Sequence, residues 1–208
     1  MTENVLPGLG RAVWLMVAVT LMWSTAGVVT RHLELARSFE VTFWRSFFML
    51  LSLCVILPAL QGRALLLTLR RSGLALWISG LCWSVMFTAF MVAILLIPVA
   101  SVLVTMAIGP LLTALLARGF IGHPIAPRTW CAIALAGVGI GWMYGAEISG
   151  LSFTGVAVAL CVPMAAAVNW VLVQHSQRHG HAVDLVPAVL LGAALSALAT
   201  LPLAWPFQ

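Results

Sequence analysis

Charged and apolar positions divide the chain into long apolar runs and short polar segments, most clearly at residues 72–117, which include no Asp, Glu, Lys, Arg or His. As one helix, rising about 1.5 Å per residue, this segment would reach roughly 70 Å, more than twice a hydrocarbon core of about 30 Å. It must therefore fold back, and Pro98 is the expected hinge because proline lacks a backbone donor and drives its predecessor out of helical geometry. The pattern predicts two membrane spans, residues 72–96 and 99–117, joined by a tight turn.

Apolar runs of about twenty residues, each long enough for one crossing, continue along the rest of the chain. They predict five further spans, at residues 11–30, 41–60, 129–146, 153–174 and 185–203. Barrel strands are excluded, because they alternate apolar and polar residues over about ten positions. We therefore expect an all-α polytopic membrane protein with about seven transmembrane helices.

Composition removes the soluble alternatives. Hydrophobic residues make up 63% of the chain and charged residues only 7%, whereas an ordinary globular domain carries about 25% charged residues. A net charge of +5, carried by arginines without any lysine, could indicate nucleic-acid binding in a soluble protein. In a membrane protein the same excess is explained by loop charges that set orientation. The expected partner is the lipid bilayer, and no nucleic acid.

The arginines are divided unequally between the two sets of predicted loops. If the N-terminus is inside, the outer segments hold only Arg31 and Arg37. The cytoplasmic segments then hold Arg11, Arg63, Arg70, Arg71, Arg118, Arg128 and Arg178. The positive-inside rule predicts a multi-pass protein of the inner or plasma membrane, with a cytoplasmic N-terminus and Gln208 outside.

Arg45 is the least ordinary residue within a predicted span. It lies about one turn into its span, where a charge costs on the order of 2.5–3.5 kcal/mol at mid-membrane and less near the interface. Its side chain either extends to the outer headgroups beside Trp44 or faces a water-filled cavity, where it holds an anionic group or fixes helix packing. Both interpretations stay open.

Other polar or helix-breaking residues at membrane depth are candidates for a substrate path. Trp23, Ser24, Thr25 and Asn169 could hydrogen-bond a substrate or a neighbouring helix. Pro110 removes one backbone hydrogen bond and bends its span, and broken spans often line transport sites.

Gly137, Gly141 and Gly145 repeat at a spacing of four residues in the fifth span. Small residues at this spacing let two helix backbones approach closely. We therefore expect this helix to pack against a neighbour through its glycines.

No arrangement of residues predicts catalysis or metal binding. His175, His179 and His181 lie in one loop without an accompanying carboxylate or thiolate cluster, and the four cysteines form no CxxC pair. There is no nucleophile–base arrangement, HExxH motif or carboxylate dyad. We expect no enzyme, no cofactor and no metal site.

Several segments, in chain order, resemble the EamA-type branch of the drug/metabolite transporter (DMT) superfamily. These are Leu21-Met22-Trp23-Ser24-Thr25, Trp44-Arg45, Phe90 to Ala100 with small residues at Ala93 and Ala100, Gly109 to Ala117, and Trp130 to Gly145. The resemblance covers nearly the whole chain. It departs at Gly122-His123, where the family usually has Gly-Glu. No carboxylate at this position can therefore play the part that it has in the family.

The resemblance also implies a domain organisation. EamA-type transporters typically have ten helices, arranged as two inverted five-helix repeats. By this resemblance the chain has one complete repeat, residues 11–146, and the first two helices of a second, residues 152–205. A second copy of the chain, as a homodimer, or missing C-terminal helices would supply the rest.

The implied function is that of an EamA-like exporter or permease, which moves small metabolites, amino acids or drugs by alternating access between the repeats. Residues expected to line the path or break a helix beside it are Trp23, Ser24, Arg45, Thr88, Pro110 and Asn169. Because no acidic residue lies within a predicted span, we expect facilitated diffusion or exchange rather than proton coupling. Two alternatives remain: a C-terminally truncated product with little activity alone, and a non-transporting membrane subunit that packs against a partner.

Overall fold

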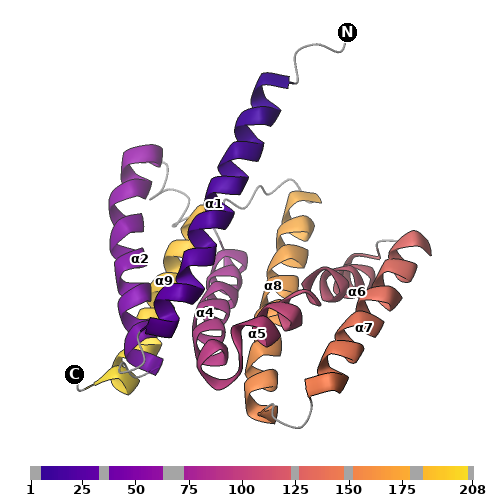
Figure 1. The fold of residues 1–208 in the computed structure, drawn as a ribbon. Coiled ribbons are helices and arrows are strands. Elements are labelled where there is room, and N and C mark those ends of the chain that lie inside the picture. Colours follow the sequence, from indigo (N-terminus) through magenta and orange to yellow (C-terminus); the bar gives the residue numbers. More distant parts are fainter. Residues whose placement is uncertain are drawn as a thin grey trace. The chain divides into compact units, whose positions relative to one another are not determined.

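The protein is helical throughout the part of the chain that the computed structural model describes, which comprises residues 6–32, 38–62, 73–122, 127–147, 152–178 and 185–205. No strand occurs among these residues (Figure 1). The helices are α1 (Leu6–His32), α2 (Ser38–Gln61), α4 (Leu74–Leu96), α5 (Val99–Met106), α6 (Gly109–Ile121), α7 (Pro127–Glu147), α8 (Phe153–Arg178) and α9 (Leu185–Ala204). Each predicted span corresponds to a helix, except that residues 99–117 are divided between α5 and α6.

Five helical segments are long and apolar enough to cross a membrane. They are Phe39–Ala59, Leu74–Leu96, Val99–Ile121, Phe153–Arg178 and Pro187–Ala204. In α1 the described apolar segment is shorter, Ala12–Thr25. The structure is therefore that of a multi-span membrane protein, and the total of seven spans stays a prediction.

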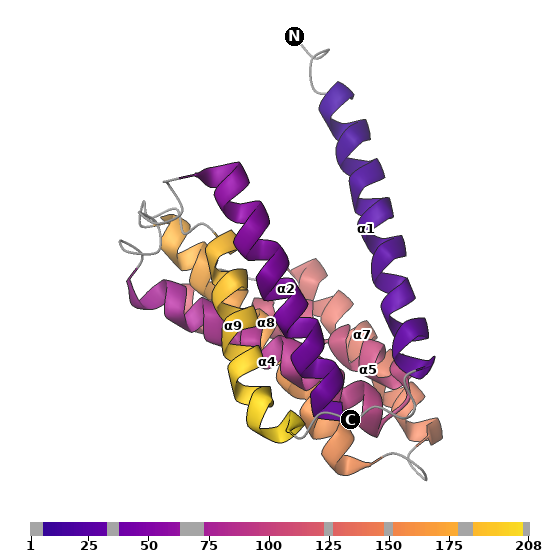
Figure 2. The same ribbon diagram turned by 90° about the vertical axis from the view of Figure 1, so that its left-hand side faces the viewer.

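The chain forms two compact units, Met1–Ala36 and Arg37–Gln208. The first contains α1. In the second, α2, α9, α4, α8 and α6 form a series in which each helix packs against the next, and α5 also packs on α8. Figure 2 shows α9 lying along α2. Helices far apart in the sequence thus become neighbours.

The contact between α4 and α9 depends on two glycines. A Cβ atom on Gly192 would overlap the Cβ of Trp83 and lie only 3.0 Å from the carbonyl oxygen of Gly80. A Cβ on Gly80 would lie 2.9 Å from the Cβ of Leu191. Small residues are needed here because the two backbones approach closely.

The expected packing through the glycines of α7 is not found. A Cβ on Gly137, Gly139 or Gly141 would meet no atom within 4 Å among the described residues. The surroundings of Gly145 lie outside what the structure describes. The spacing was misleading because it marks a face on which close packing is allowed, without specifying that a partner helix occupies it.

The predicted hinge at Pro98 is confirmed. Ile97 and Pro98 both have extended backbone, with ψ of 159° and 141°, so α4 ends and α5 begins within two residues. Ile97 is buried with Ala93, Val102 and Ala159 in a small apolar cluster. Since Ala159 belongs to α8, this cluster holds the turn against that helix.

The bend predicted at Pro110 is confirmed, but it falls slightly earlier, at Ala107–Ile108. There the N–H of Ile108 donates to the carbonyl oxygen of Thr105 at 3.2 Å, a tighter turn than an α-helix makes. Pro110 itself lies in the first turn of α6, where its missing donor is not needed. The break precedes the proline because its ring would clash with the carbonyl four residues back, that of Met106.

Candidate functional site

A groove of about 480 Å³ runs between α6 and α8, beginning at the α5–α6 break. Its lining residues are Gly109, Pro110, Thr113, Ala114, Ala117, Ala166, Trp170 and Gln174. The hydroxyl of Thr113 donates to the carbonyl oxygen of Gly109 at 2.9 Å, within its own helix. The Trp170 indole and the Gln174 amide therefore remain the groove's side-chain groups for recognising a polar solute.

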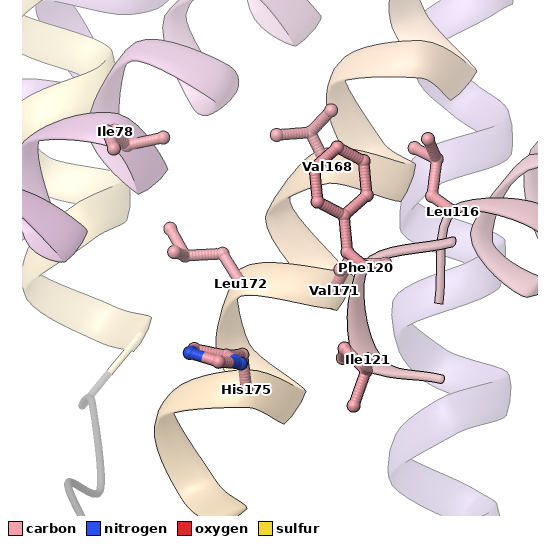
Figure 3. A pocket seen from close by; sticks show the side chains of 8 residues that line it. All are labelled: Ile78, Leu116, Phe120, Ile121, Val168, Val171, Leu172 and His175. Carbon is pink, nitrogen blue, oxygen red and sulfur yellow. The ribbon is translucent and has the colours of Figure 1, made fainter. Parts of the chain in front are cut away.

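A second cavity, of about 310 Å³, lies beside α4, α6 and α8. It is lined by Ile78, Leu116, Phe120, Ile121, Val168, Val171, Leu172 and His175 (Figure 3). Among these side chains only the His175 ring carries polar atoms. We call this space the apolar cavity; it suits a hydrocarbon or aromatic group, because such a group would bury apolar area on both sides.

Three hydroxyls from three helices meet where α2, α4 and α9 come together. The Oγ of Ser196 lies 3.0 Å from the Oγ of Ser46 and 2.9 Å from the Oγ1 of Thr88. The Arg45 guanidinium lies over the ring of Phe87, with 5.6 Å between the Cζ atom and the ring centroid. We call this place the α2–α4–α9 junction.

A separate polar pair joins α4 to α8. The hydroxyl of Ser79 donates to the Oδ1 of Asn169 at 2.6 Å, and both side chains are buried. Ser79 is nine positions before Thr88 on α4, or about 13 Å along the helix axis. Asn169 is thus not part of the α2–α4–α9 junction.

The structure brings together only some of the residues predicted from the sequence. Arg45 and Thr88 meet at the α2–α4–α9 junction, while Pro110 lines the α6–α8 groove. Trp23 and Ser24 belong to α1, which is in the other compact unit. The hydroxyl of Ser24 donates to the carbonyl oxygen of Leu21 at 2.7 Å, so it is satisfied within its own helix.

Sequence reasoning missed Ser46, Ser79, Trp83, Trp170 and Ser196. Each is a single polar or aromatic residue in an apolar helix, and local pattern does not separate such residues from lipid-facing ones. The one available signal was that Ser46 directly follows Arg45.

Glu40 directly precedes the predicted second span, residues 41–60. In the structure it lies in the first turn of α2, within a segment able to span the membrane, and is 7% exposed. A buried carboxylate is therefore present at one end of a span.

Among the described residues, no group of three or more His, Cys, Asp or Glu could hold a metal ion. His175 lines the apolar cavity, and His179 and His181 lie outside the described residues.

The described part of the chain thus forms a multi-span helical membrane protein with a groove between two of its helices. The sequence pattern of the EamA-like transporter family matches residues 10–145. The chain belongs to this family, as its motifs predicted, and its family is one of transporters rather than enzymes. Comparisons with curated proteins and with solved structures give no match.

Proposed function

We propose that the protein is an EamA-type permease or exporter of small metabolites, amino acids or drugs in the cell membrane. The solute would pass along α4, α6 and α8, using the α6–α8 groove and the apolar cavity. The two spaces offer it the indole of Trp170, the amide of Gln174 and apolar walls. The membrane and the transporter family are established; the solute class and the route are the proposal.

The break between α5 and α6 is the observation that carries this proposal. It interrupts a span of 23 residues, Val99–Ile121, close to its middle, and the α6–α8 groove begins there. Pro110 cannot donate to the carbonyl oxygen of Met106, so the break leaves a backbone acceptor without its helical partner. Irregular backbone at membrane depth is tolerated where it lines a cavity, as in transport sites.

We further propose alternating access between a first repeat, residues 11–146, and a partial second repeat, residues 152–205, with the N-terminus inside. What supports this is that α8 and α9, from the second segment, pack directly on α4 and α2, from the first. A rocking motion of one segment on the other would open and close the spaces beside α4, α6 and α8. Arg45, Thr88 and Asn169 lie along these moving contacts, whereas a part for Trp23 and Ser24 rests on the family motif alone.

Transport in proteoliposomes tests the proposal. Vesicles containing the full chain would be assayed for uptake of a mixture of radiolabelled amino acids, with protein-free vesicles as the blank. Ala114→Phe places a ring in the α6–α8 groove, and Pro110→Ala restores the missing donor and straightens the α5–α6 segment. Both variants should slow initial uptake at least about tenfold, since blocking or misplacing a contact of about 1.4 kcal/mol or more has that effect.

Two controls make the result specific. Ala132→Phe adds the same ring on the exposed surface of α7, and Pro58→Ala removes a proline inside α2. Both should retain wild-type uptake. Equal rates for Ala114→Phe and wild type would overturn the proposed route, and uptake no greater than the blank for every amino acid would exclude amino acids as the solute.

A further inference from the structure

The α2–α4–α9 junction carries more hydrogen-bond donors than acceptors. Its polar groups are the guanidinium of Arg45, the indole N–H of Trp83 and the hydroxyls of Ser46, Thr88 and Ser196. Each of these groups has a donor to offer, and a guanidinium and an indole N–H cannot accept. The junction therefore lacks hydrogen-bond acceptors for some of these donors.

Arg45 turns inward rather than toward its aromatic neighbour. Trp44 is 40% exposed and stacks on Phe48 with 5.7 Å between ring centroids. Arg45 is partly buried instead, and its guanidinium covers the ring of Phe87 on α4. The observed position therefore disfavours an arginine that merely extends to the headgroups beside Trp44.

The three hydroxyls bring one more hydrogen-bond donor than they use among themselves. They bring three O–H donors but make two contacts with each other, Ser46 to Ser196 and Thr88 to Ser196. Whichever oxygen donates in each contact, one O–H is left without an acceptor among the described residues. Ser46 is 3% exposed and Ser196 is fully buried, whereas Thr88 is only partly buried, so the leftover donor is shielded from water when it belongs to Ser46 or Ser196.

The indole of Trp83 is a second unsatisfied donor. Its Nε1 atom is buried and has no hydrogen-bond acceptor among the described residues. Its ring lies 5.4 Å from that of Phe87, centroid to centroid, and Phe87 is the ring that Arg45 covers. A buried polar group without a partner is destabilising, so an acceptor placed here would be favoured.

The neighbouring helices supply no ionised acceptor. The described residues of α4 and α9, the helices packed against α2, contain no Asp, Glu, Lys, Arg or His. Glu40 lies on α2 itself, but it is five residues before Arg45 and so about 140° away around the helix. No ion pair joins the two within the described part of the chain.

We propose that the α2–α4–α9 junction binds an oxyanion, such as a carboxylate or a phosphate. Arg45 supplies the charge and a planar fork that matches two oxygens. The Trp83 indole and the spare hydroxyl supply further donors as the contact among the three helices loosens. The rings of Phe87 and Trp83 favour an anion with an apolar part. The proposal concerns binding at a place apart from the α6–α8 groove, so it does not depend on the proposed function.

The test is ligand-induced thermal stabilisation of the full chain, purified in a maltoside detergent that contains no phosphate. Benzoate is the probe, and benzamide and benzylamine are its neutral and cationic counterparts. Benzoate should raise the unfolding midpoint in a concentration-dependent manner, because a ligand that binds only the folded state stabilises it. Equal shifts with all three compounds, or none with benzoate, would overturn the proposal.

Variants assign the effect to named groups. Arg45→Gln should weaken benzoate binding by at least about tenfold, as should Trp83→Phe, because hydrogen bonds to charged groups contribute more than neutral ones. Arg45→Lys keeps the charge but not the planar guanidinium, so its affinity for benzoate should lie between those of Arg45→Gln and wild type. It replaces Arg45→Gln in the test if that variant does not fold.

The matched controls are Arg118→Gln, from an exposed arginine that covers Trp130 at 5.8 Å, and Trp142→Phe, from an exposed tryptophan. Both should bind benzoate as wild type does, and weakening of binding by Arg118→Gln equal to that by Arg45→Gln would contradict the assignment.

The oxyanion could come from a solute or from a lipid headgroup, and a second arm separates them. The protein would be placed in nanodiscs of uncharged glycolipid or of phosphatidylglycerol. If the headgroup phosphate is the ligand, benzoate binding should be lost in phosphatidylglycerol and kept in glycolipid. If a solute is the ligand, benzoate binding should persist in both kinds of nanodisc. Absence of benzoate binding in the glycolipid discs contradicts the site whichever the source.

Discussion

Single polar side chains join helices that the sequence separates widely. Ser79 on α4 and Asn169 on α8 are 90 positions apart, yet their side chains meet at 2.6 Å in a buried site. Ser46 and Ser196 are 150 positions apart and lie 3.0 Å from each other. In a membrane such contacts matter because lipid offers a polar group no alternative partner.

Loss of the Ser79 hydroxyl should weaken the α4–α8 contact by a measurable amount. Ser79→Ala leaves the Oδ1 of Asn169 without its donor, and hydrogen bonds between membrane helices contribute about 0.6 kcal/mol on average and up to about 1.7 kcal/mol. Unfolding in mixed micelles should show a loss in this range. Ser52→Ala, from an exposed serine of α2, is the control and should leave stability unchanged. If Ser79→Ala and Ser52→Ala lose equal stability, the Ser79–Asn169 hydrogen bond does not stabilise the α4–α8 contact.

Glu40 is the residue at which the expectation of transport without proton coupling can be tested. Its carboxylate lies in the first turn of α2, where a negative charge interacts favourably with the helix dipole, by about 0.3–1 kcal/mol. We expect Glu40→Gln to lose stability of that order, because it removes the charge. Uptake by wild type and by the variant should be equally independent of an imposed pH gradient. Gradient-driven uptake that disappears in Glu40→Gln would instead identify Glu40 as a proton-coupling group.

At the scale of elements, the prolines and glycines determine where helices break and how closely they pack. Pro98 and Pro110 act within a few residues of themselves, so both effects could be predicted from the sequence. Glycine packing could not, because it depends on what lies opposite. Gly192 faces α4 directly, whereas Gly137 faces open space, although both are glycines in apolar helices.

Substitution of these two glycines by alanine should have opposite effects. Gly192→Ala forces α9 away from α4 and should cost about 1–3 kcal/mol, the usual penalty for an overpacked contact. Gly137→Ala meets nothing and should be neutral or stabilise α7 by up to about 1 kcal/mol through helix propensity. Thermal unfolding in detergent compares the two. A destabilising Gly137→Ala would show that α7 packs through its glycines after all.

For the whole molecule, the order of the helices in space differs from their order in the chain. The packed series α2, α9, α4, α8 and α6 mixes helices from residues 11–146 with helices from residues 152–205. Three arginines lie near the ends of their helices: Arg118 in α6, Arg128 in α7 and Arg178 in α8. In the seven-span arrangement these ends share one side of the membrane.

Topology reporters test that arrangement directly. A reporter placed after Gln208 should be active only outside the cell, and one inserted between residues 179 and 184, next to Arg178, only in the cytoplasm, because the positive-inside rule keeps arginine-bearing segments there. Both fusions should still be recovered from the membrane fraction. A cytoplasmic signal from the reporter after Gln208 would rule out seven spans with the N-terminus inside.

Apolar length and proline stereochemistry act locally along the chain, so the membrane, the helices, the turn at Pro98 and the break near Pro110 could be predicted from the sequence. The family was indicated by resemblance of its motifs. The sequence also places Arg45, Thr88 and Asn169 at membrane depth, but does not indicate what they face. That Arg45 covers Phe87, that Thr88 meets Ser196, and that Asn169 accepts from Ser79 is a result of helix packing. Those partners lie on other helices, and for Thr88 and Ser196 the close approach of α4 and α9 depends on Gly80 and Gly192.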